Sequence, residues 1–246
     1  MKSSLLPGDG ALEQRFFVLY GLRGAGKTQL SLQFIKTYHN RYRSIFFFNF
    51  LLAELECRYR HVFFINANSE ECIKASFEDV GKELHLPQPS NIATYWWFSR
   101  QTKPWLLLFN NADNADLDLH RFLPECEQGT IIITICNCQC IMHVPDLHNW
   151  NIDDMSHKDA IKLLYRASCC IANTDLDTTK TLVDWLSCFA LAMSQAAGFL
   201  FMNHDKSFTW YLSHIEKSPK SLFENCSKQS MDSYHKSVFT TWEISF

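Results

Sequence analysis

Residues 21–28 read Gly-Leu-Arg-Gly-Ala-Gly-Lys-Thr, which fits the phosphate-binding pattern G-x-x-x-x-G-K-[ST] without a mismatch. The flanks agree with it. Residues 16–20 (FFVLY) form a short apolar, β-prone run, and in residues 29–35 the apolar Leu30 and Phe34 have helical spacing. A strand, a glycine turn and a helix in this order are the setting that such a loop needs, which disfavours a chance glycine turn. The stretch therefore predicts an α/β fold whose first strand leads into a nucleotide-binding loop.

The residue types of this loop have a chemical reason. Glycines let backbone N–H groups point inward around a β-phosphate, and the N-terminus of the following helix adds a partial positive charge. We expect Lys27 to reach the β- and γ-phosphates of ADP or ATP, and the Thr28 hydroxyl to ligate Mg²⁺. The residues predicted to contact the nucleotide are Gly21, Arg23, Gly24, Ala25, Gly26, Lys27, Thr28 and Gln29.

The rest of the chain continues an α/β pattern and then becomes helical. Residues 61–65 (HVFFI), 105–109 (WLLLF) and 129–134 (GTIIIT) are apolar runs of the kind found in a buried parallel sheet. Residues 70–84 and 91–101 have helical patterns. Polar residues 110–114 stand at the carboxyl end of a strand, where open α/β sheets place ligands. After about residue 150, the spacing of Ser156 and Asp159 resembles a capping box that opens a series of helices.

Composition narrows the classes of partner. With 47% hydrophobic and 20% charged residues, the chain is an ordinary soluble globular protein. A net charge of −3 and the absence of long basic runs argue against nucleic acid as a partner. Residues 96–98 (WWF) have no basic residues between them, so we expect these aromatic side chains in the core and not in a stacking platform for nucleic acid. No apolar stretch reaches the ~18 to 20 residues that a bilayer requires, and no secretory signal is visible. The ten cysteines lack zinc-site spacing, so we expect reduced thiols and a cytoplasmic location.

Residues 44–60 do not fit this plan. They begin with an apolar run rich in Phe and Leu, and the tripeptide Arg-Tyr-Arg occurs on both sides, at residues 41–43 and 58–60. Only one apolar run is needed as the second strand, and residues 61–65 fit it better because a turn and a helix cap follow. We interpret residues 44–60 as an insertion, and an extra hairpin or helix packed on the rim of the sheet as the alternative.

Taken together, these motifs resemble the NB-ARC domain of fungal receptor-like signalling NTPases of the STAND class. The resemblance covers residues 16–246 and rests on residues 18–30, 105–114, 129–137, 188–198 and 239–246. It implies a switch that ADP holds closed and that ATP opens for self-association or for protein partners. It divides the chain into a lead-in (1–15), a nucleotide-binding α/β domain (16–152), a helical domain (153–235) and the truncated start of a winged-helix domain (236–246).

The chain departs from that family at positions that matter for hydrolysis. The aspartate that supports the metal at the end of the strand 105–109 corresponds to Asn110, a weaker metal partner, although Asp113 lies close by in sequence. The arginine that senses the γ-phosphate corresponds to Cys136, which offers no fixed positive charge. The proline that lies against the adenine corresponds to Ala190, followed by Leu191. The resemblance therefore implies nucleotide binding with weak or absent hydrolysis.

Three functions remain open from the sequence. The first is an ADP- or ATP-binding switch module with little turnover. The second is an active ATPase or small-molecule kinase on the same fold, which needs a metal carboxylate and an acceptor site. The third is a remnant that binds no nucleotide and acts only as an interaction domain. Nucleotide-dependent thermal stability distinguishes the third from the other two, because ligand binding to the native state raises the melting temperature.

Overall fold

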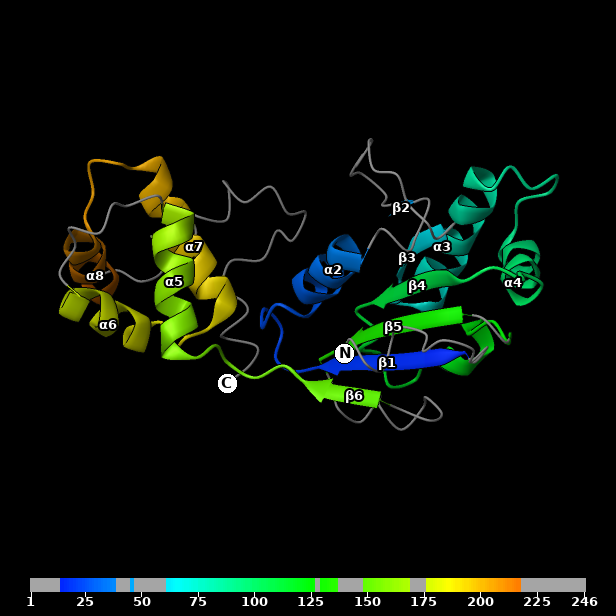
Figure 1. The fold of residues 1–246 in the computed structure, drawn as a ribbon, viewed down its shortest axis with the longest axis horizontal. Coiled ribbons are helices and arrows are strands. Elements are labelled where there is room, and N and C mark those ends of the chain that lie inside the picture. The colour runs from blue at the N-terminus through cyan, green and yellow to red at the C-terminus, as the bar shows by residue number, and fades with distance from the viewer. Residues whose placement is uncertain are drawn as a thin grey trace. The chain divides into compact units, whose positions relative to one another are not determined.

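The computed structural model describes residues 14–38, 45–46, 61–126, 129–136, 148–168 and 176–217 (Figure 1). By their internal contacts these residues fall into two compact units. The first contains the chain up to Gly21 and Lys27–Ile152, and the second contains Leu22–Gly26 and the residues from Asp153 onward. The first is an α/β unit and the second is helical.

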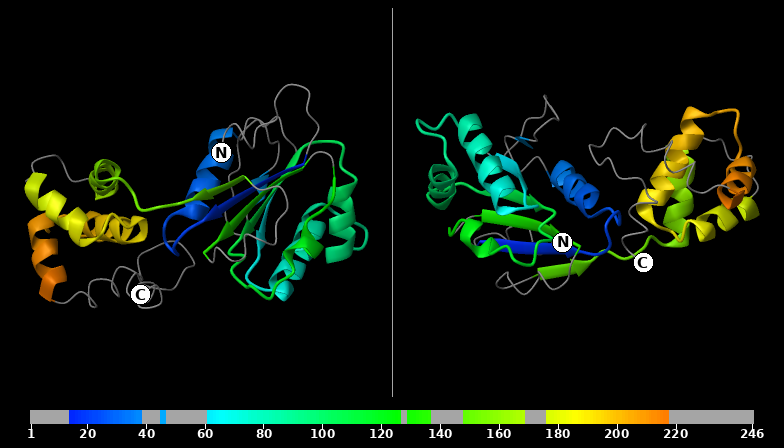
Figure 2. Two further views of the ribbon diagram at one scale, coloured as in Figure 1. Left: turned by 90° about the horizontal axis from the view of Figure 1, so that it is seen from below. Right: turned by 180° about the vertical axis from the view of Figure 1, so that it is seen from behind.

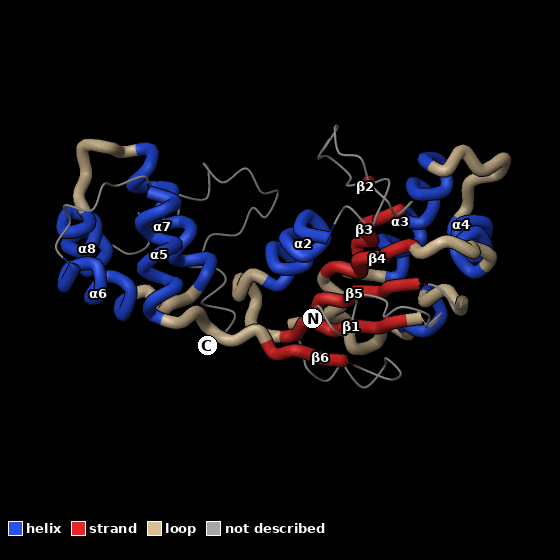
Figure 3. Tube along the Cα trace, in the orientation of Figure 1, coloured by secondary structure: helices blue, strands red, loops and turns tan. Residues whose placement is uncertain are grey.

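The α/β unit is built on a parallel sheet whose six described strands lie in the order β2-β3-β4-β5-β1-β6 (Figure 3). Parallel neighbours need crossover connections, and the described helices on these connections are α2 (Lys27–Tyr38), α3 (Glu70–Glu83) and α4 (Asn91–Ser99). A short 3₁₀ helix, η2 (Leu119–Phe122), lies between the fourth and fifth strands. The predicted α/β class is confirmed, with strands β1 (Arg15–Tyr20), β2 (Ile45–Phe46), β3 (His61–Asn66), β4 (Trp105–Asn110), β5 (Gly129–Ile135) and β6 (His148–Asn151).

Both faces of the sheet are covered, and β4 shows how. Trp105, Leu107 and Phe109 belong to the core that α3 and α4 complete. Leu106 and Leu108 point to the opposite face and belong to the core that α2 completes. Figure 2 shows α2 and α3 on opposite sides of the sheet. Because water reaches neither face, all six residues of β4 and all seven of β5 are buried, which explains their continuous apolar pattern.

The register of the strands brings their carboxyl ends to one edge. Tyr20 of β1 lies opposite Ile135 of β5, and Asn66 of β3 lies opposite Asn110 of β4. Side chains that follow these strands therefore share one edge of the sheet although they are far apart in sequence. This is the edge at which open α/β sheets bind ligands.

The helical unit contains α5 (His157–Ser168), α6 (Leu176–Trp185), α7 (Ala190–Met202) and α8 (Phe208–Lys217). Its core is formed by buried side chains from all four helices, among them Leu164, Leu182, Met193 and Phe208. The predicted start of α5 is confirmed: Ser156 Oγ accepts the Asp159 N–H at 3.2 Å and donates to Asp159 Oδ2 at 2.8 Å. None of the helices that the structure describes has the length and apolar character that crossing a bilayer requires.

Three features differ from the sequence-based expectations. Strand β6 was not predicted, because its residues His-Asn-Trp-Asn are all exposed and carry no apolar pattern. The core expectation is wrong for Trp96, which is 54% exposed, whereas Phe98 is fully buried. The sheet also has a place for part of the 44–60 run, since Ile45–Phe46 form β2 beside β3. The remainder of 44–60, residues 1–13 and residues 218–246 lie outside the described residues, so the insertion and the winged-helix start stay predictions.

Candidate functional site

The predicted phosphate loop lies between β1 and α2, as the pattern requires. Lys27 is the first residue of α2, so the loop meets the positive end of the helix dipole. A Cβ added to Gly21 would lie 2.4 Å from the backbone oxygen of Ile152, so this close approach excludes any larger residue. Gly26 has φ +95°, in the left-handed region that favours glycine. The glycines of the motif are therefore required by the backbone they form.

Lys27 places a buried positive charge at the start of α2. Its side chain is buried, with 7% of its surface exposed. Its Nζ donates to the backbone oxygen of Gly21 at 2.8 Å and to Cys136 Sγ at 3.1 Å. A buried ammonium must be hydrogen-bonded, and both of these acceptors are neutral. The loop thus places a buried positive charge at the carboxyl edge of the sheet.

Thr28 and Asn110 contact each other directly. Thr28 Oγ1 donates to Asn110 Oδ1 at 2.6 Å, and Thr134 Oγ1 donates to the same oxygen at 3.1 Å. Asn110 is 5% exposed and sits at the last position of β4. Its side-chain oxygen therefore accepts from a hydroxyl of α2 and a hydroxyl of β5, and ties the loop helix to the middle of the sheet.

Asp113 and Cys136 are joined across the ends of β4 and β5. The Cys136 backbone N–H donates to Asp113 Oδ1. Burial raises the pKa of the Cys136 thiol above its usual range, and the nearby Lys27 charge opposes this shift without cancelling it. The thiol is therefore neutral at physiological pH and brings no charge to the loop. The structure thus collects five of the predicted site residues at one edge, namely Lys27, Thr28, Asn110, Asp113 and Cys136.

Thr134 is a site residue that sequence reasoning missed. It belongs to the predicted strand 129–134, and no motif singles out its hydroxyl. Its role follows from the pairing of Phe109 with Ile133, which brings the next residue of each strand, Asn110 and Thr134, together. Thr134 Oγ1 also accepts the Asn111 N–H at 2.9 Å, and so fixes the turn after β4. The signal was a polar residue ending an otherwise apolar strand.

The remaining predicted residues lie in the helical unit or on the surface of the loop. Within the helical unit, a Cβ added to Gly24 would lie 2.7 Å from Phe189 Cζ and 3.1 Å from Leu191 Cβ. The same construction at Gly26 gives 4.0 Å to Ala190 Cβ. Ala190 and Leu191 open α7. Of the other loop residues, Arg23 is half-buried, Gln29 is exposed, and the Ala25 N–H donates to the Leu22 backbone oxygen at 3.2 Å.

The conformation of Gly26 makes a testable contrast with Gly198. Gly26→Ala is expected to destabilise the protein by about 1 to 3 kcal/mol, because alanine is strained at this positive φ. Gly198→Ala lies inside α7, where nothing is within 4 Å of an added Cβ, and is expected to stabilise it by about 0.5 to 1 kcal/mol. Urea unfolding of both variants checks this. Equal effects of the two substitutions would contradict the strained loop geometry.

A metal ion accompanying a nucleotide would meet an unusual set of donors here. Mg²⁺ is bound through carboxylate oxygens together with phosphates and water. Thr28 keeps lone pairs for such an ion, but Asn110 beside it is neutral. Within the described ranges, no group of three or more His, Cys, Asp or Glu side chains is placed to hold a metal. It is the neutral Asn110 beside Thr28, where a carboxylate would help to hold the ion, that makes a tightly held Mg²⁺ a poor fit to these residues.

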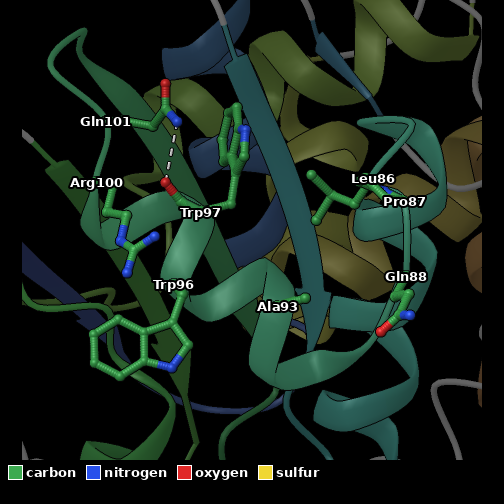
Figure 4. A pocket seen from close by; sticks show the side chains of 8 residues that line it. All are labelled: Leu86, Pro87, Gln88, Ala93, Trp96, Trp97, Arg100 and Gln101. Atoms are coloured by element: carbon green, nitrogen blue, oxygen red, sulfur yellow. Dashed lines mark hydrogen bonds between the residues drawn. The ribbon is translucent and has the colours of Figure 1, made fainter.

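A surface groove lies elsewhere on the α/β unit (Figure 4). Its volume is about 480 Å³, and residues 100–104 lead from it into the amino end of β4, the edge opposite the candidate site. The exposed Trp96 and Arg100 lie on one side of it, with the Arg100 guanidinium carbon 5.9 Å from the centre of the Trp96 ring. It is lined by Leu86, Pro87, Gln88, Ala93, Trp96, Trp97, Arg100 and Gln101.

Comparisons with known proteins bear on the fold. No protein-family model matches the sequence, and no curated protein matches it. The crystal structure of Cdc6p from Pyrobaculum aerophilum is similar, with a TM-score of 0.54 and 12% identity. That match covers 89% of this chain, which spans 62% of the length of Cdc6p.

Two weaker likenesses are a STAND protein with a tetratricopeptide repeat sensor from Pyrococcus horikoshii and the FIGL-1 AAA domain in complex with ADP. The first has a TM-score of 0.45 and 14% identity over 76% of this chain and 29% of that one. The second has a TM-score of 0.43 and 8% identity over 94% of this chain and 78% of that one. The likeness to Cdc6p, taken with the strand order and the loop between β1 and α2, shows that the chain has an α/β fold of the P-loop NTPase kind.

Proposed function

We propose that this chain binds ADP or ATP at residues 21–29 and serves as a nucleotide-dependent signalling module with slow hydrolysis. The observation that carries the proposal is the position of Lys27. It is a buried cation at the N-terminus of α2, at the carboxyl edge of a parallel sheet, and it donates to a backbone carbonyl and a neutral thiol. A phosphate oxygen is a better partner for an ammonium than a carbonyl or a thiol, because its negative charge strengthens the hydrogen bond.

In this proposal each part of the site has one task. The backbone N–H groups of residues 24–29 surround the β-phosphate, and Lys27 exchanges its present acceptors for phosphate oxygens. Thr28, held by Asn110, fixes the first turn of α2 against the sheet. Arg23 and Gln29 flank the loop, and Ala190 and Leu191 provide the apolar contact for the base, as the NB-ARC resemblance implies.

Slow hydrolysis is proposed from the same contacts. Phosphoryl transfer depends on positive charge at the γ-phosphate and on a well-placed metal. The neutral Asn110 brings no negative charge to Thr28 and the metal side of the loop, and the Cys136 thiol lies 3.1 Å from Lys27 Nζ without a charge of its own. A site that binds nucleotide and turns it over slowly suits a switch better than an ATPase or a kinase.

The experiment that tests the proposal is a calorimetric titration of the chain with ADP and with ATP. We expect a saturable 1:1 binding curve for both nucleotides. GMP and inorganic phosphate serve as controls, because neither presents both the adenine and the diphosphate. No heat of binding with either adenine nucleotide up to about 1 mM would leave only the interaction-domain reading.

We extend the proposal to organisation and partners. Residues 16–152, 153–235 and 236–246 would form the nucleotide domain, the helical domain and the start of a winged helix, and exchange of ADP for ATP would permit self-association. Light scattering measured with saturating ADP and with saturating ATP tests this. The same molar mass in both nucleotides would contradict nucleotide-controlled assembly of this chain.

A further inference from the structure

The carboxyl edge of the sheet carries amides where a metal site needs charge. Asn66 ends β3 and Asn110 ends β4, and the two are register partners. Asn68 and Asn111 follow them, joined by a hydrogen bond of 2.8 Å from Asn111 Nδ2 to Asn68 Oδ1. These four side chains provide dipoles but no negative charge. A hard dication such as Mg²⁺ therefore gains little from this edge.

The oxygen of Asn110 is also fully used. An amide oxygen has two lone pairs, and here both accept hydroxyl protons, from Thr28 at 2.6 Å and from Thr134 at 3.1 Å. Turning this oxygen toward a metal would leave a buried and a half-buried hydroxyl without their acceptor, which is unfavourable. Asn110 is thus a structural link between α2, β4 and β5 and does not act as a metal ligand.

Three carboxylates that follow β3 and β4 contact other protein groups. Asp113 accepts the Cys136 N–H and holds the turn after β4 to the end of β5. Glu70 pairs with Lys74 at 2.7 Å, and Glu71 accepts the Ser69 hydroxyl at 2.7 Å at the start of α3. Lys27 adds a positive charge that repels a dication.

From these contacts we propose that the loop binds its nucleotide without a tightly held Mg²⁺, so that Mg²⁺ contributes little to nucleotide affinity. The inference rests on the proposed nucleotide binding and states what neutralises the phosphates: Lys27, the loop N–H groups and the α2 dipole. Loss of an outer partner of a metal site lowers metal affinity by about 10- to 100-fold. Asn110 accepts the hydroxyl of Thr28, the expected metal ligand, and so occupies the position of such an outer partner. A charged partner at this position would strengthen metal binding, and Asn110 is neutral.

The test is the ratio of the ADP dissociation constant in EDTA to that in excess Mg²⁺, measured by calorimetry on the full chain. For the natural sequence we expect this ratio to stay within about threefold of one, below the roughly 10- to 100-fold effect of a charged outer partner. Asn110→Asp restores the charge and keeps both hydroxyl donors, so its ratio should rise to about tenfold or more. Asn68→Asp is the matched control, because it adds the same charge nearby, keeps the acceptor for Asn111 and does not touch Thr28.

The outcomes separate this inference from the proposed function. A ratio of about tenfold or more for the natural sequence would overturn the metal-independent site while leaving nucleotide binding intact. Equal ratios for Asn110→Asp and Asn68→Asp would also overturn it, because the effect would then come from general charge. No ADP binding in either buffer would overturn the proposed function and this inference together. Melting curves of the two variants without ADP show whether each is folded. If either variant is unfolded, the ratio measured for the natural sequence alone decides between a metal-dependent and a metal-independent site.

Discussion

Lys27→Ala is expected to abolish the nucleotide-induced rise in melting temperature. At an ADP concentration about 100 times the dissociation constant, binding stabilises the natural chain by about 2.7 kcal/mol. For a protein of this size that corresponds to a shift of roughly 5 to 10 °C, since 1 kcal/mol moves the midpoint by about 2 to 4 °C. The variant lacks the ammonium that contacts the phosphates, so its melting curves with and without ADP should superimpose. Differential scanning fluorimetry is sufficient to measure this.

Two further variants make the result interpretable. Lys36→Ala removes a lysine from the exposed side of the same helix and should retain the full shift. Lys27→Met keeps most of the buried side-chain volume while removing the charge, which guards against a folding defect in the alanine variant. A normal ADP shift in folded Lys27→Ala or Lys27→Met would show that the nucleotide binds elsewhere or not through this loop.

The double variant Asn110→Asp, Cys136→Arg is expected to gain ATP hydrolysis. The carboxylate restores charge beside Thr28, and the guanidinium introduces a fixed positive charge on the residue whose thiol now lies 3.1 Å from Lys27 Nζ. An arginine at the γ-phosphate is worth about 10³ to 10⁵ in rate in related phosphoryl transfers. We therefore expect turnover to rise by at least about 10³-fold over the natural chain. The measurement is phosphate release from ATP by the purified variant alone.

The control for this experiment is the same double variant carrying Lys27→Ala, which should show no turnover above buffer. It distinguishes activity of this site from a contaminating ATPase. Turnover of the natural chain near ~1 s⁻¹, the lower end of ordinary enzyme rates, would refute slow hydrolysis. The single variants apportion the gain, and because both residues belong to one site their effects should not be additive.

Much of the fold was predictable because its signals are local. A strand, a glycine-rich turn ending in Lys-Thr and an amphipathic helix are read within about 20 residues, and each is fixed by backbone preferences or by burial of one face. Strands β4 and β5 were predictable for the same reason, since a strand covered on both faces must be apolar throughout. The loop residues could therefore be named from the sequence pattern, whereas Asn110 and Cys136 were named from their positions in the NB-ARC resemblance.

The remaining features depend on pairings between distant segments, which no local pattern records. Strand β6 exists because its backbone pairs with β1, and its four exposed side chains carry no sign of it. Thr134 reaches Asn110 through the register of β5 against β4, and Cys136 reaches Lys27 across 109 positions of sequence. The sequence alone determined the glycine-rich loop between β1 and α2 and the class of sheet, because burial and backbone strain act on neighbouring residues. The tertiary structure decided which neutral groups surround Thr28 and Lys27, because hydrogen bonds between strands depend on register and not on composition.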